Sequence, residues 1–245
     1  MMIPGFIPLN SEQCVLHESR IDLWQFSLEQ ELHVADSFLN AEEKARASRF
    51  YFDRHRRRFA TARTAVRIIL ARYLNTAPQD LEFTYNPQGK PSVVNTQKLQ
   101  FNLSHSKDLA LLAVGKQFPI GVDIEHYSAR PYEGIAANLF SKKELAELQK
   151  APPSLKAALF FHIWSQKEAF IKINGLGLSY PTQEFSVPTT FPTKQLVEDP
   201  LYNTTWQLRS FMPKIACSGA LCHHPTVREI RHGIIQLEQS TSLVF

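Results

Sequence analysis

The spacing of apolar and polar residues predicts strands and helices in alternation along the first third of the chain. Loose alternation predicts a strand over residues 21–28. Asn40 and Glu43 have the spacing of a capping box, which predicts a short basic helix over residues 41–51. A longer helix is expected over residues 55–74, because apolar residues recur there at spacings of three and four: Phe59, Ala62, Val66, Ile69 and Tyr73.

The next segment is rich in short strands. Alternation predicts a strand over residues 81–85, and the Asn-Pro-Gln-Gly sequence that follows at 86–89 fits a type I turn. Three more strands are expected over residues 99–105, 110–114 and 118–125. Strands joined by such short turns are typical of an antiparallel meander, so we expect one here.

The second part of the chain repeats this order of elements. A polar connector at residues 126–131 is the best candidate boundary between two halves. Ser141 and Glu144 indicate a second capping box, and a helix over residues 154–174 is expected to end at Gly175. Strand patterns follow at 185–187, 205–211, 215–222 and 233–237. Although no internal sequence repeat is clear, this order predicts an α+β fold.

Composition narrows the class of protein. With 245 residues, 44% hydrophobic and 20% charged, the chain can bury a sizeable core, which excludes disordered and fibrous classes. The cysteines are too few for a disulfide framework, no apolar run reaches membrane-spanning length, and the first ten residues lack the features of a signal peptide. We therefore expect a cytoplasmic location. A net charge of +4 suits an anionic ligand without requiring nucleic acid.

The first candidate for chemistry is the Gly-Val-Asp-Ile-Glu sequence at residues 121–125. On a strand, Asp123 and Glu125 share one face about 7 Å apart. Two such carboxylates repel each other, and a hard divalent cation such as Mg²⁺ would relieve that repulsion. The alternative is an exposed strand face with two solvated acids.

The second candidate is the helix at residues 160–174. Trp164, Glu168 and Lys172 fall on one face, which also fits an ordinary helical ion pair worth about 0.2–0.5 kcal/mol. However, the helix is apolar nearly all round, which is typical of a buried helix. A buried acid and a buried lysine need partners, and a metal and a phosphate would supply them.

Two further segments carry polar side chains. Ser104 and His105 are adjacent on a strand and point to opposite faces, which argues against a nucleophile–base pair but leaves a ligand-binding role or a polar strand end. Basic residues are concentrated between positions 44 and 72, a pattern that is consistent either with nucleic-acid binding or with a solvated helix face. Arg58 borders the apolar stripe and Lys90 lies at a tight turn, so both could hold a phosphate.

Taken together, these motifs resemble the 4′-phosphopantetheinyl transferases, in particular the two-halved surfactin-synthetase-activating (Sfp-like) type. The matching segments lie in the family's order across about residues 40–190: Gly89-Lys90-Pro91, the Phe-Asn-Leu-Ser-His-Ser segment at 101–106, the 121–125 sequence, the Phe-Ser-Lys-Lys-Glu segment at 140–144, and Trp-Ser-Gln-Lys-Glu-Ala-Phe-Ile-Lys at 164–172 with Gly175 and Gly177. The resemblance implies two similar, pseudo-symmetric α+β halves, 1–120 with the coenzyme A contacts and 121–245 with the metal site and catalytic helix, and an active site between them.

The resemblance also implies a reaction and site residues. The enzyme would move 4′-phosphopantetheine from coenzyme A to a serine of an apo carrier protein, with Mg²⁺, releasing adenosine 3′,5′-bisphosphate. Asp123, Glu125 and Glu168 match the magnesium site, Glu168 or a water it orients matches the base, and Lys172 matches the lysine that stabilises the transition state or protonates the leaving group. Residues matching coenzyme A contacts are Ser104, His105, Lys90 and Arg58, with Lys44 and Arg46 near those for the 3′-phosphate.

The partners follow from the same resemblance. The carrier could belong to fatty-acid, polyketide or nonribosomal-peptide synthesis, and an acidic carrier would suit basic residues such as Lys142 and Lys143. We expect a monomer that binds neither nucleic acid nor a membrane. The alternatives are a nucleic-acid-binding protein that uses the basic helices at 41–74, or a metal-dependent nuclease that uses the same three carboxylates.

Overall fold

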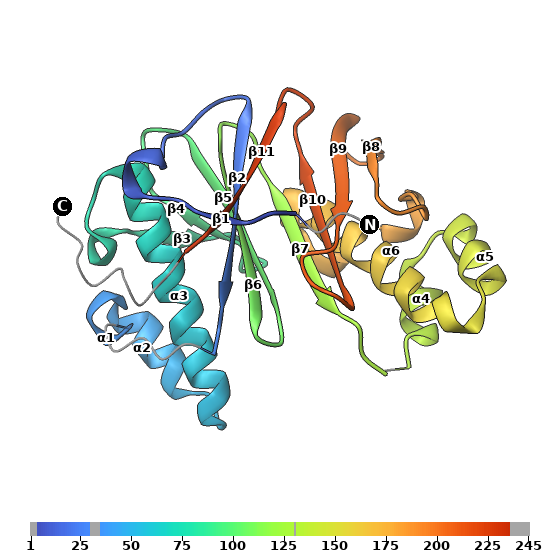
Figure 1. The fold of residues 1–245 in the computed structure, drawn as a ribbon, viewed down its shortest axis with the longest axis horizontal. Coiled ribbons are helices and arrows are strands. Elements are labelled where there is room, and N and C mark those ends of the chain that lie inside the picture. Colours follow the sequence, from blue (N-terminus) through green and yellow to red (C-terminus); the bar gives the residue numbers. More distant parts are fainter. Residues whose placement is uncertain (1–3, 30–34, 130, 236–245) are drawn as a thin grey trace.

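The protein has the predicted α+β architecture, with two halves side by side. The computed structural model describes residues 4–29, 35–129 and 131–235. Four layers follow one another across the molecule: α3, a first sheet, a second sheet and α6 (Figure 1). The first sheet has the strand order β1-β11-β2-β6-β5, the second has β7-β10-β9-β8, and β3 and β4 form a separate hairpin.

The elements of the first half are β1 (Ile7–Pro8), β2 (Arg20–Ser27), α1 (Ala35–Phe38), α2 (Ala41–Ser48), α3 (Asp53–Leu74), β3 (Phe83–Tyr85), β4 (Pro91–Val93), β5 (Leu99–Ser106) and β6 (Leu109–Lys116). Those that follow are β7 (Gly121–His126), α4 (Glu133–Leu139), α5 (Lys142–Lys150), α6 (Pro153–Asn174), β8 (Lys194–Asp199), β9 (Thr204–Phe211), β10 (Cys217–His223) and β11 (Glu229–Ile234). Short 3-10 turns are η1 (Ser11–Gln13), η2 (Pro78–Asp80), η3 (Gly177–Ser179) and η4 (Thr182–Glu184).

Both predicted capping boxes are present and begin the short helices. Asn40 accepts from the backbone of Glu43, whose side chain accepts from Asn40 in return, and α2 starts at the next residue. Ser141 and Glu144 do the same at the start of α5. The long helices end as the sequence predicts, α3 at a left-handed Asn75 and α6 at a left-handed Gly175.

Three apolar clusters hold the four layers together. The predicted stripe of α3 packs on the first sheet, with Val66 and Ile69 fully buried. The apolar residues of α6 pack on the second sheet, as expected for a helix that is apolar nearly all round. The third cluster lies between the sheets and joins Leu23 and Leu111 of the first to Val122, Ile124 and Leu221. The halves are therefore joined by a continuous core.

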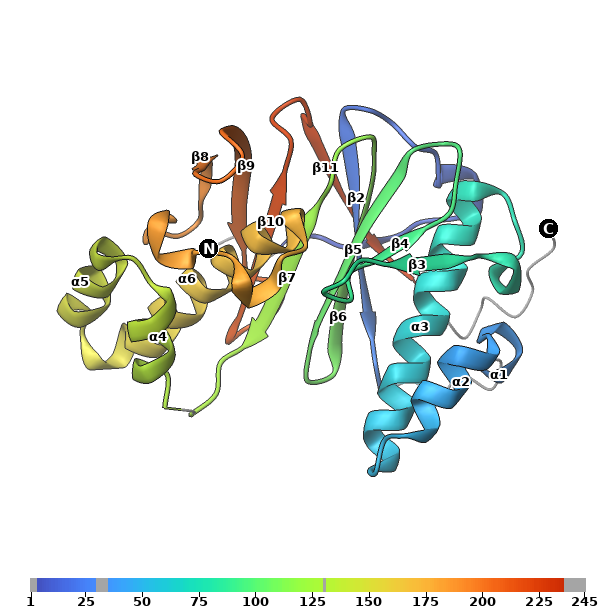
Figure 2. The same cartoon turned by 180° about the vertical axis from the view of Figure 1, so that it is seen from behind.

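The expected meander is wrong at its third strand. Strands β5 and β6 pair antiparallel, but β7 pairs with β10 in the second sheet. Side chains of β5, rather than its backbone, bond the N–H groups of β7: Asn102 to Val122 (2.8 Å), Ser104 to Ile124 (3.3 Å) and Ser106 to His126 (3.1 Å). This side-chain ladder takes the place of a backbone ladder, and β5 and β7 lie at the seam between the halves (Figure 2).

The last part of the chain also departs from the predicted strands. Residues 185–187 are irregular, because the backbone N–H of Val187 donates to the carboxylate of Glu144 instead of joining a sheet. The strand expected at 233–237 forms earlier, as β11, while residues 236 and 237 lie outside the described chain. β11 pairs parallel with β2, so this segment of the 121–245 half belongs to the first sheet. Among the described helices, none is long and apolar enough to cross a membrane.

Candidate active site at the junction of β7 and α6

Helix α6 approaches strand β7 so closely that one position admits only glycine. A Cβ atom added to Gly121 would lie 1.8 Å from the carbonyl oxygen of Ala169 and 3.2 Å from the nitrogen of Ile173. Both atoms belong to the backbone, so a side-chain rotation could not relieve the clash. The glycine that opens the 121–125 sequence therefore brings the helix face with Glu168 and Lys172 against the strand.

Asp123 is the centre of the contacts between the two elements. The residue is 4% exposed. One carboxylate oxygen, Oδ1, accepts from Lys172 Nζ at 2.6 Å and from Ser104 Oγ at 2.8 Å. The other oxygen, Oδ2, is buried and has no hydrogen-bond partner within the described chain. Since buried carboxylate oxygens are costly to leave unsatisfied, Oδ2 is an available acceptor at the heart of the site.

Glu125 is oriented by groups from two other elements. Oε1 accepts from the indole Nε1 of Trp164 on α6 at 3.1 Å, and Oε2 accepts from Ser106 Oγ on β5 at 3.2 Å. These bonds fix the carboxylate of a partly buried side chain at the seam between the halves. Trp164 shares a helix face with Glu168 and Lys172 in the sequence, and this hydrogen bond gives it a role in orienting Glu125.

The third carboxylate, Glu168, has a strongly altered acidity. Burial and the negative charges of Asp123 and Glu125 together raise the pKa of Glu168 to about 7, although the positive charge of Lys172 opposes the rise. The charges of Asp123, Glu125 and Lys172 all act on Glu168, and Lys172 bonds Asp123 directly, so the three acids and the lysine lie close together although they come from two separate segments. A carboxyl group that titrates near neutral pH is suited to take up and release a proton.

Lys172 links the acids to a cluster of positive charge. Besides Asp123, its ammonium donates to the backbone oxygen of Val122 at 3.0 Å. The pKa of His105 is lowered by partial desolvation and by the charges of Lys172 and Arg58. His105 itself is exposed and lies on the face of β5 opposite Ser104, as the alternation predicts. Lys172 and Arg58 therefore bring positive charge to the edge of the acidic site, while the lowered pKa of His105 favours its neutral imidazole.

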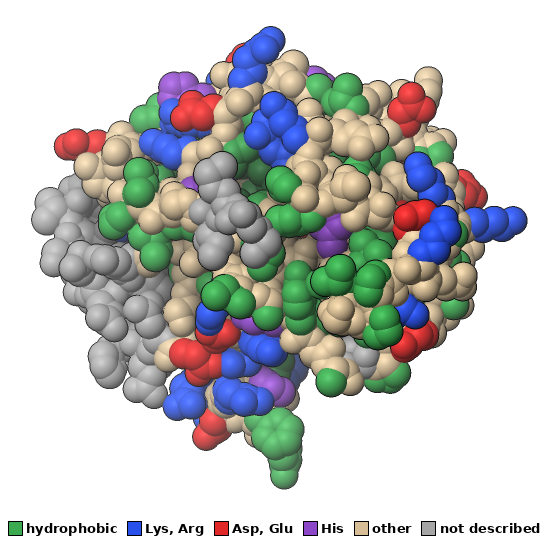
Figure 3. Space-filling view, turned by 45° about the vertical axis from the view of Figure 1, so that its right-hand side comes forward, with side chains coloured by type: hydrophobic (Ala, Val, Ile, Leu, Met, Phe, Trp, Pro, Cys, Tyr) green, Lys and Arg blue, Asp and Glu red, His purple; other side chains and the backbone are tan. Residues whose placement is uncertain are grey.

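The other predicted basic residues lie in different surroundings. Arg58 Nε donates to Glu29 at 2.9 Å. Lys44 and Arg46 are exposed on α2, and the guanidinium of Arg46 lies 5.3 Å from the centre of the Phe59 ring. No described contact joins them to the acids. Figure 3 shows Lys and Arg side chains gathered among acidic ones at the lower end of the molecule, where α2 meets α3.

Some of the basic residues between 44 and 72 serve the interior rather than a ligand. Arg63 and Arg67 are buried and form ion pairs with the buried Glu43. Arg67 also donates to the backbone oxygens of Pro78 and Leu81. They are therefore not available to a phosphate or to nucleic acid at the surface.

Lys90 lies at the predicted turn, but its ammonium faces the second half. It donates to the backbone oxygens of Lys172 (2.5 Å) and Ile173 (3.0 Å), at the end of α6. Burial and the charge of Lys172 lower the pKa of Lys90 to about 8.

Sequence reasoning missed two residues of the site. Asn102 and Ser106 hold β7 and its acids in place, and they occupy alternate positions with Ser104 along β5. Three polar side chains on one face of a strand next to an apolar sheet were a usable signal, because a buried polar face needs partners. Which strand supplies them is a long-range property that the segment itself does not contain.

The acids offer donor groups of the right chemistry for magnesium. Mg²⁺ prefers oxygen ligands, and the site has three carboxylates and the unsatisfied Oδ2 of Asp123. Among the described residues, however, no group of three or more acidic, histidine or cysteine side chains has the arrangement of a formed metal site. Lys172 holds Asp123 Oδ1, and Trp164 and Ser106 hold Glu125. The carboxylates therefore have the oxygen chemistry that a hard cation prefers, but in the described arrangement they are bonded to these other groups.

Comparison with known proteins defines the class. Residues 119–218 match the model of the 4′-phosphopantetheinyl transferase superfamily, and residues 22–117 match that of the 4′-phosphopantetheinyl transferase N-terminal region. The chain belongs to the 4′-phosphopantetheinyl transferase family and is a transferase of that class.

Individual relatives support the same assignment over most of the chain. The 4′-phosphopantetheinyl transferase HetI of Nostoc is 36% identical over 216 residues, covering 84% of this chain and 88% of the relative. The transferase ffp of Bacillus subtilis is 32% identical over 187 residues, covering 76% and 82%. Sfp of the same species is 35% identical over 151 residues, covering 62% and 66%. The predicted resemblance is thus confirmed.

Proposed function

We propose that the protein transfers the 4′-phosphopantetheine group of coenzyme A to a serine hydroxyl of an apo carrier protein in the presence of Mg²⁺, releasing adenosine 3′,5′-bisphosphate. The observation that supports this most is the gathering of Asp123, Glu125, Glu168 and Lys172 at one junction. Phosphoryl transfer needs such a combination, because charge must be neutralised on the phosphate while a hydroxyl loses its proton.

In this mechanism the carrier serine oxygen forms a bond to the β-phosphorus of coenzyme A, and the bond from that phosphorus to the bridging oxygen breaks. Glu168, or a water that it orients, accepts the serine proton. Lys172 stabilises the developing charge on the phosphate or protonates the leaving oxygen. A magnesium ion held by Asp123, Glu125 and Glu168 would neutralise charge on the pyrophosphate.

Coenzyme A would lie along the first half beside this site. Arg58 would provide positive charge for the pyrophosphate, and His105, whose lowered pKa favours the neutral imidazole, would contact the pyrophosphate through its ring. Ser104 would act mainly through Asp123, to which its hydroxyl is already bonded. The exposed Lys44 and Arg46 would hold the 3′-phosphate at the surface of α2.

The carrier protein would approach the second half. Lys142 and Lys143 are exposed in the first turn of α5, and carriers that are acidic around the target serine would complement them. Replacing both lysines with Glu is expected to raise the KM for the carrier while the KM for coenzyme A is unchanged. An unchanged carrier KM would place the docking surface elsewhere.

The decisive test is a panel of apo acyl, peptidyl and polyketide carriers incubated with coenzyme A and Mg²⁺. A mass gain of one phosphopantetheine on at least one carrier is expected, together with release of adenosine 3′,5′-bisphosphate and loss of transfer with EDTA. No gain on any carrier would contradict the proposed reaction. Transfer that persists at full rate after Asp123→Ala would remove the proposed metal role.

A further inference from the structure

The end of α6 is held by a turn from the other half of the molecule. The β3–β4 hairpin belongs to the first half and reaches toward the second (Figure 2). The side chain of Lys90, at the end of its turn, is close enough to bond two carbonyl oxygens of the last turn of α6, those of Lys172 and Ile173. Asn86, at the start of the turn, donates from Nδ2 to the carbonyl oxygen of Gly175 at 2.9 Å.

These three carbonyl groups belong to the part of a helix that needs outside partners. The last four C=O groups of a helix have no partner within it, and the negative end of the helix dipole favours a cation there. Lys90 supplies both a donor and a positive charge. The contact is therefore a helix cap whose donors come from a segment more than eighty residues away in the sequence.

The turn is built to present these donors. The backbone N–H groups of Gln88 and Lys90 donate to Asn86 Oδ1 at 3.1 and 2.7 Å, and Gly89 adopts φ +84°. The same side chain of Asn86 thus closes the turn with its oxygen and bonds α6 with its nitrogen. The bonds within the turn already restrict the backbone around Asn86, so the contact with α6 costs little further conformational entropy.

Gly175 shows how close this contact is. Its φ of +68° is in the left-handed region, and an added Cβ would lie 2.6 Å from Asn86 Nδ2 and 3.0 Å from Lys90 Cδ. The left-handed end of the helix therefore favours glycine, and a side chain at this position would displace the side chains of Asn86 and Lys90.

The capped turn carries the lysine of the site. The backbone oxygen of Lys172 accepts from Lys90, while its own ammonium reaches back to Asp123 at 2.6 Å. A shift of this turn would move the ammonium relative to the acids. Small displacements of a reacting group are expensive, since about 1 Å can cost 10²-fold in rate.

We propose that Lys90 is a positioning residue: its ammonium caps α6 across the seam between the halves and so fixes Lys172 beside Asp123. Lys90 acts through Lys172 and does not need its ammonium for coenzyme A. This inference rests on the proposed function, because it assigns Lys172 a part in the transfer. It differs from the role that the family resemblance implies for Lys90, and the two roles predict different kinetics.

The test compares Lys90→Met with Lys98→Met, which changes an exposed lysine of the same half. Positioning predicts that Lys90→Met lowers kcat about tenfold, with the KM for coenzyme A within twofold of the original value. Lys90→Arg, which keeps a cationic donor, should recover part of the lost kcat, and Lys98→Met should change neither constant.

A second measurement does not depend on activity. The amide of Gly175 donates to Ile171 in the last turn of α6, and its hydrogen exchange is expected to accelerate in Lys90→Met but not in Lys98→Met. A large rise in the coenzyme A KM with unchanged kcat and unchanged exchange would overturn the inference and make Lys90 a coenzyme A contact. If the unaltered protein transfers nothing, the proposed function fails, whereas the exchange measurement still decides whether Lys90 caps the helix.

Discussion

The two halves use the same framework, but only one leaves it open for chemistry. In the first half, Asp22 on β2 is buried and accepts from Tyr73 on α3 at 2.6 Å. In the second half, Asp123 on β7 is buried and accepts from Lys172 on α6, also at 2.6 Å. Each sequence pattern is an aspartate between two apolar residues, Ile-Asp-Leu and Val-Asp-Ile. A strand aspartate bonded by the long helix is thus common to both halves.

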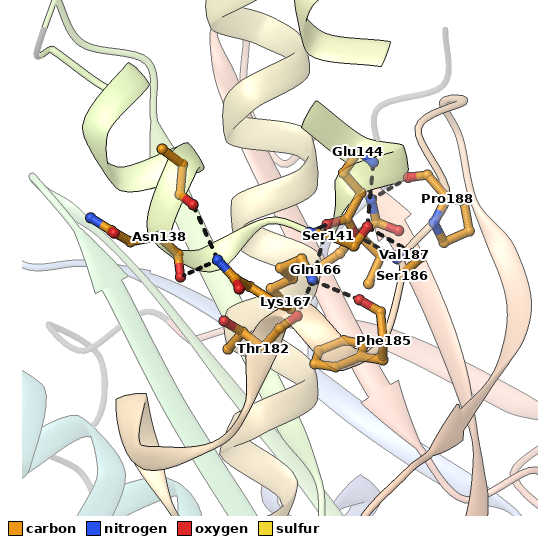
Figure 4. A network of polar contacts seen from close by, with 12 residues as sticks. Asn138, Ser141, Glu144, Gln166, Lys167, Thr182, Phe185, Ser186, Val187 and Pro188 are labelled. Atoms are coloured by element: carbon orange, nitrogen blue, oxygen red, sulfur yellow. Dashed lines mark hydrogen bonds and ion pairs between the residues drawn. The ribbon is translucent and has the colours of Figure 1, made fainter. Parts of the chain in front are cut away.

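A buried ion pair also recurs in both halves. The capping-box glutamates Glu43 and Glu144 are both buried, and each pairs with a cation of the long helix, Arg67 or Lys167. These two cations occupy the same position counted from the first residue of α3 and of α6. Figure 4 shows the second pair, in which Lys167 also donates to the backbone oxygens of Thr182 and Phe185.

The difference lies in what surrounds the aspartate. Both oxygens of Asp22 are occupied, since Arg231 bonds both and Arg20 and Tyr73 bond one each. Asp123 keeps one oxygen without a partner in the described chain. By the same count along the helices, the position of Glu168 in α6 is held in α3 by Ile68, a core residue. The comparison teaches that the chemistry arises from the partners of the aspartate rather than from the framework.

The largest effect is expected from replacing Glu168, the acid whose position in the first half is held by Ile68. Glu168→Gln keeps the size and burial of the side chain but cannot accept the serine proton. Transfer to a carrier is expected to fall about 10²–10⁴-fold, the usual contribution of a general base. Single-turnover rates at saturating coenzyme A would measure this, and Glu184→Gln, at an exposed glutamate, is the control. A loss below tenfold would contradict the role of Glu168 as base.

The ion pairs should respond alike, because they belong to the shared framework. Arg67→Met and Lys167→Met each leave a buried glutamate with one cation fewer, and breaking a buried pair costs about 3–5 kcal/mol. Urea unfolding would measure both losses. Glu43 keeps Arg63 as a second partner, so the first variant is expected to lie at the lower end of this range. A loss in one half alone would show that the two pairs are not equivalent.

The framework was easier to predict from the sequence than the site. The capping boxes and the ends of the long helices depend on residues a few positions apart, so local patterns identified Asn40, Ser141 and Gly175. The order and spacing of the motifs also indicated that Asp123 and Glu168 match residues of one site in the transferase family. The side-chain ladder from β5 to β7 and the parallel return of β11 join residues far apart in the chain, and no local periodicity encodes such pairings. The prediction of a three-stranded meander was wrong for that reason.

Gly121 tests how closely the open half must pack its helix on its strand. Gly121→Ala places a Cβ against the backbone of Ala169, and we expect a loss of about 3 kcal/mol in the free energy of unfolding, together with slower transfer. Gly134→Ala is a matched control in the same half, because a Cβ there meets nothing within 4 Å. Urea unfolding of both variants would measure the difference. Equal stability of the two variants would mean that α6 can shift without cost.

The smallest expected effect is the loss of stability that the second half suffers because it carries Glu168 where the first half has the apolar Ile68. The pKa of Glu168 is about 7 in the folded protein against an ordinary value of 4.5. The folded state therefore holds the proton more tightly than the unfolded chain, so the free energy of unfolding falls as the pH rises from about 4.5 to 7.

Glu168→Gln has no such proton to lose. Without added divalent cations, it should match the unaltered protein near pH 4 and exceed it by about 1–3 kcal/mol above pH 7. Urea unfolding at a series of pH values would measure this, with Glu184→Gln expected to follow the unaltered protein throughout. A constant difference at every pH would show that the amide acts through packing. A gain that grows between about pH 4.5 and 7 and is constant above pH 7 would mean that the second half is less stable because it keeps an ionised acid among others, a cost that the first half avoids with Ile68.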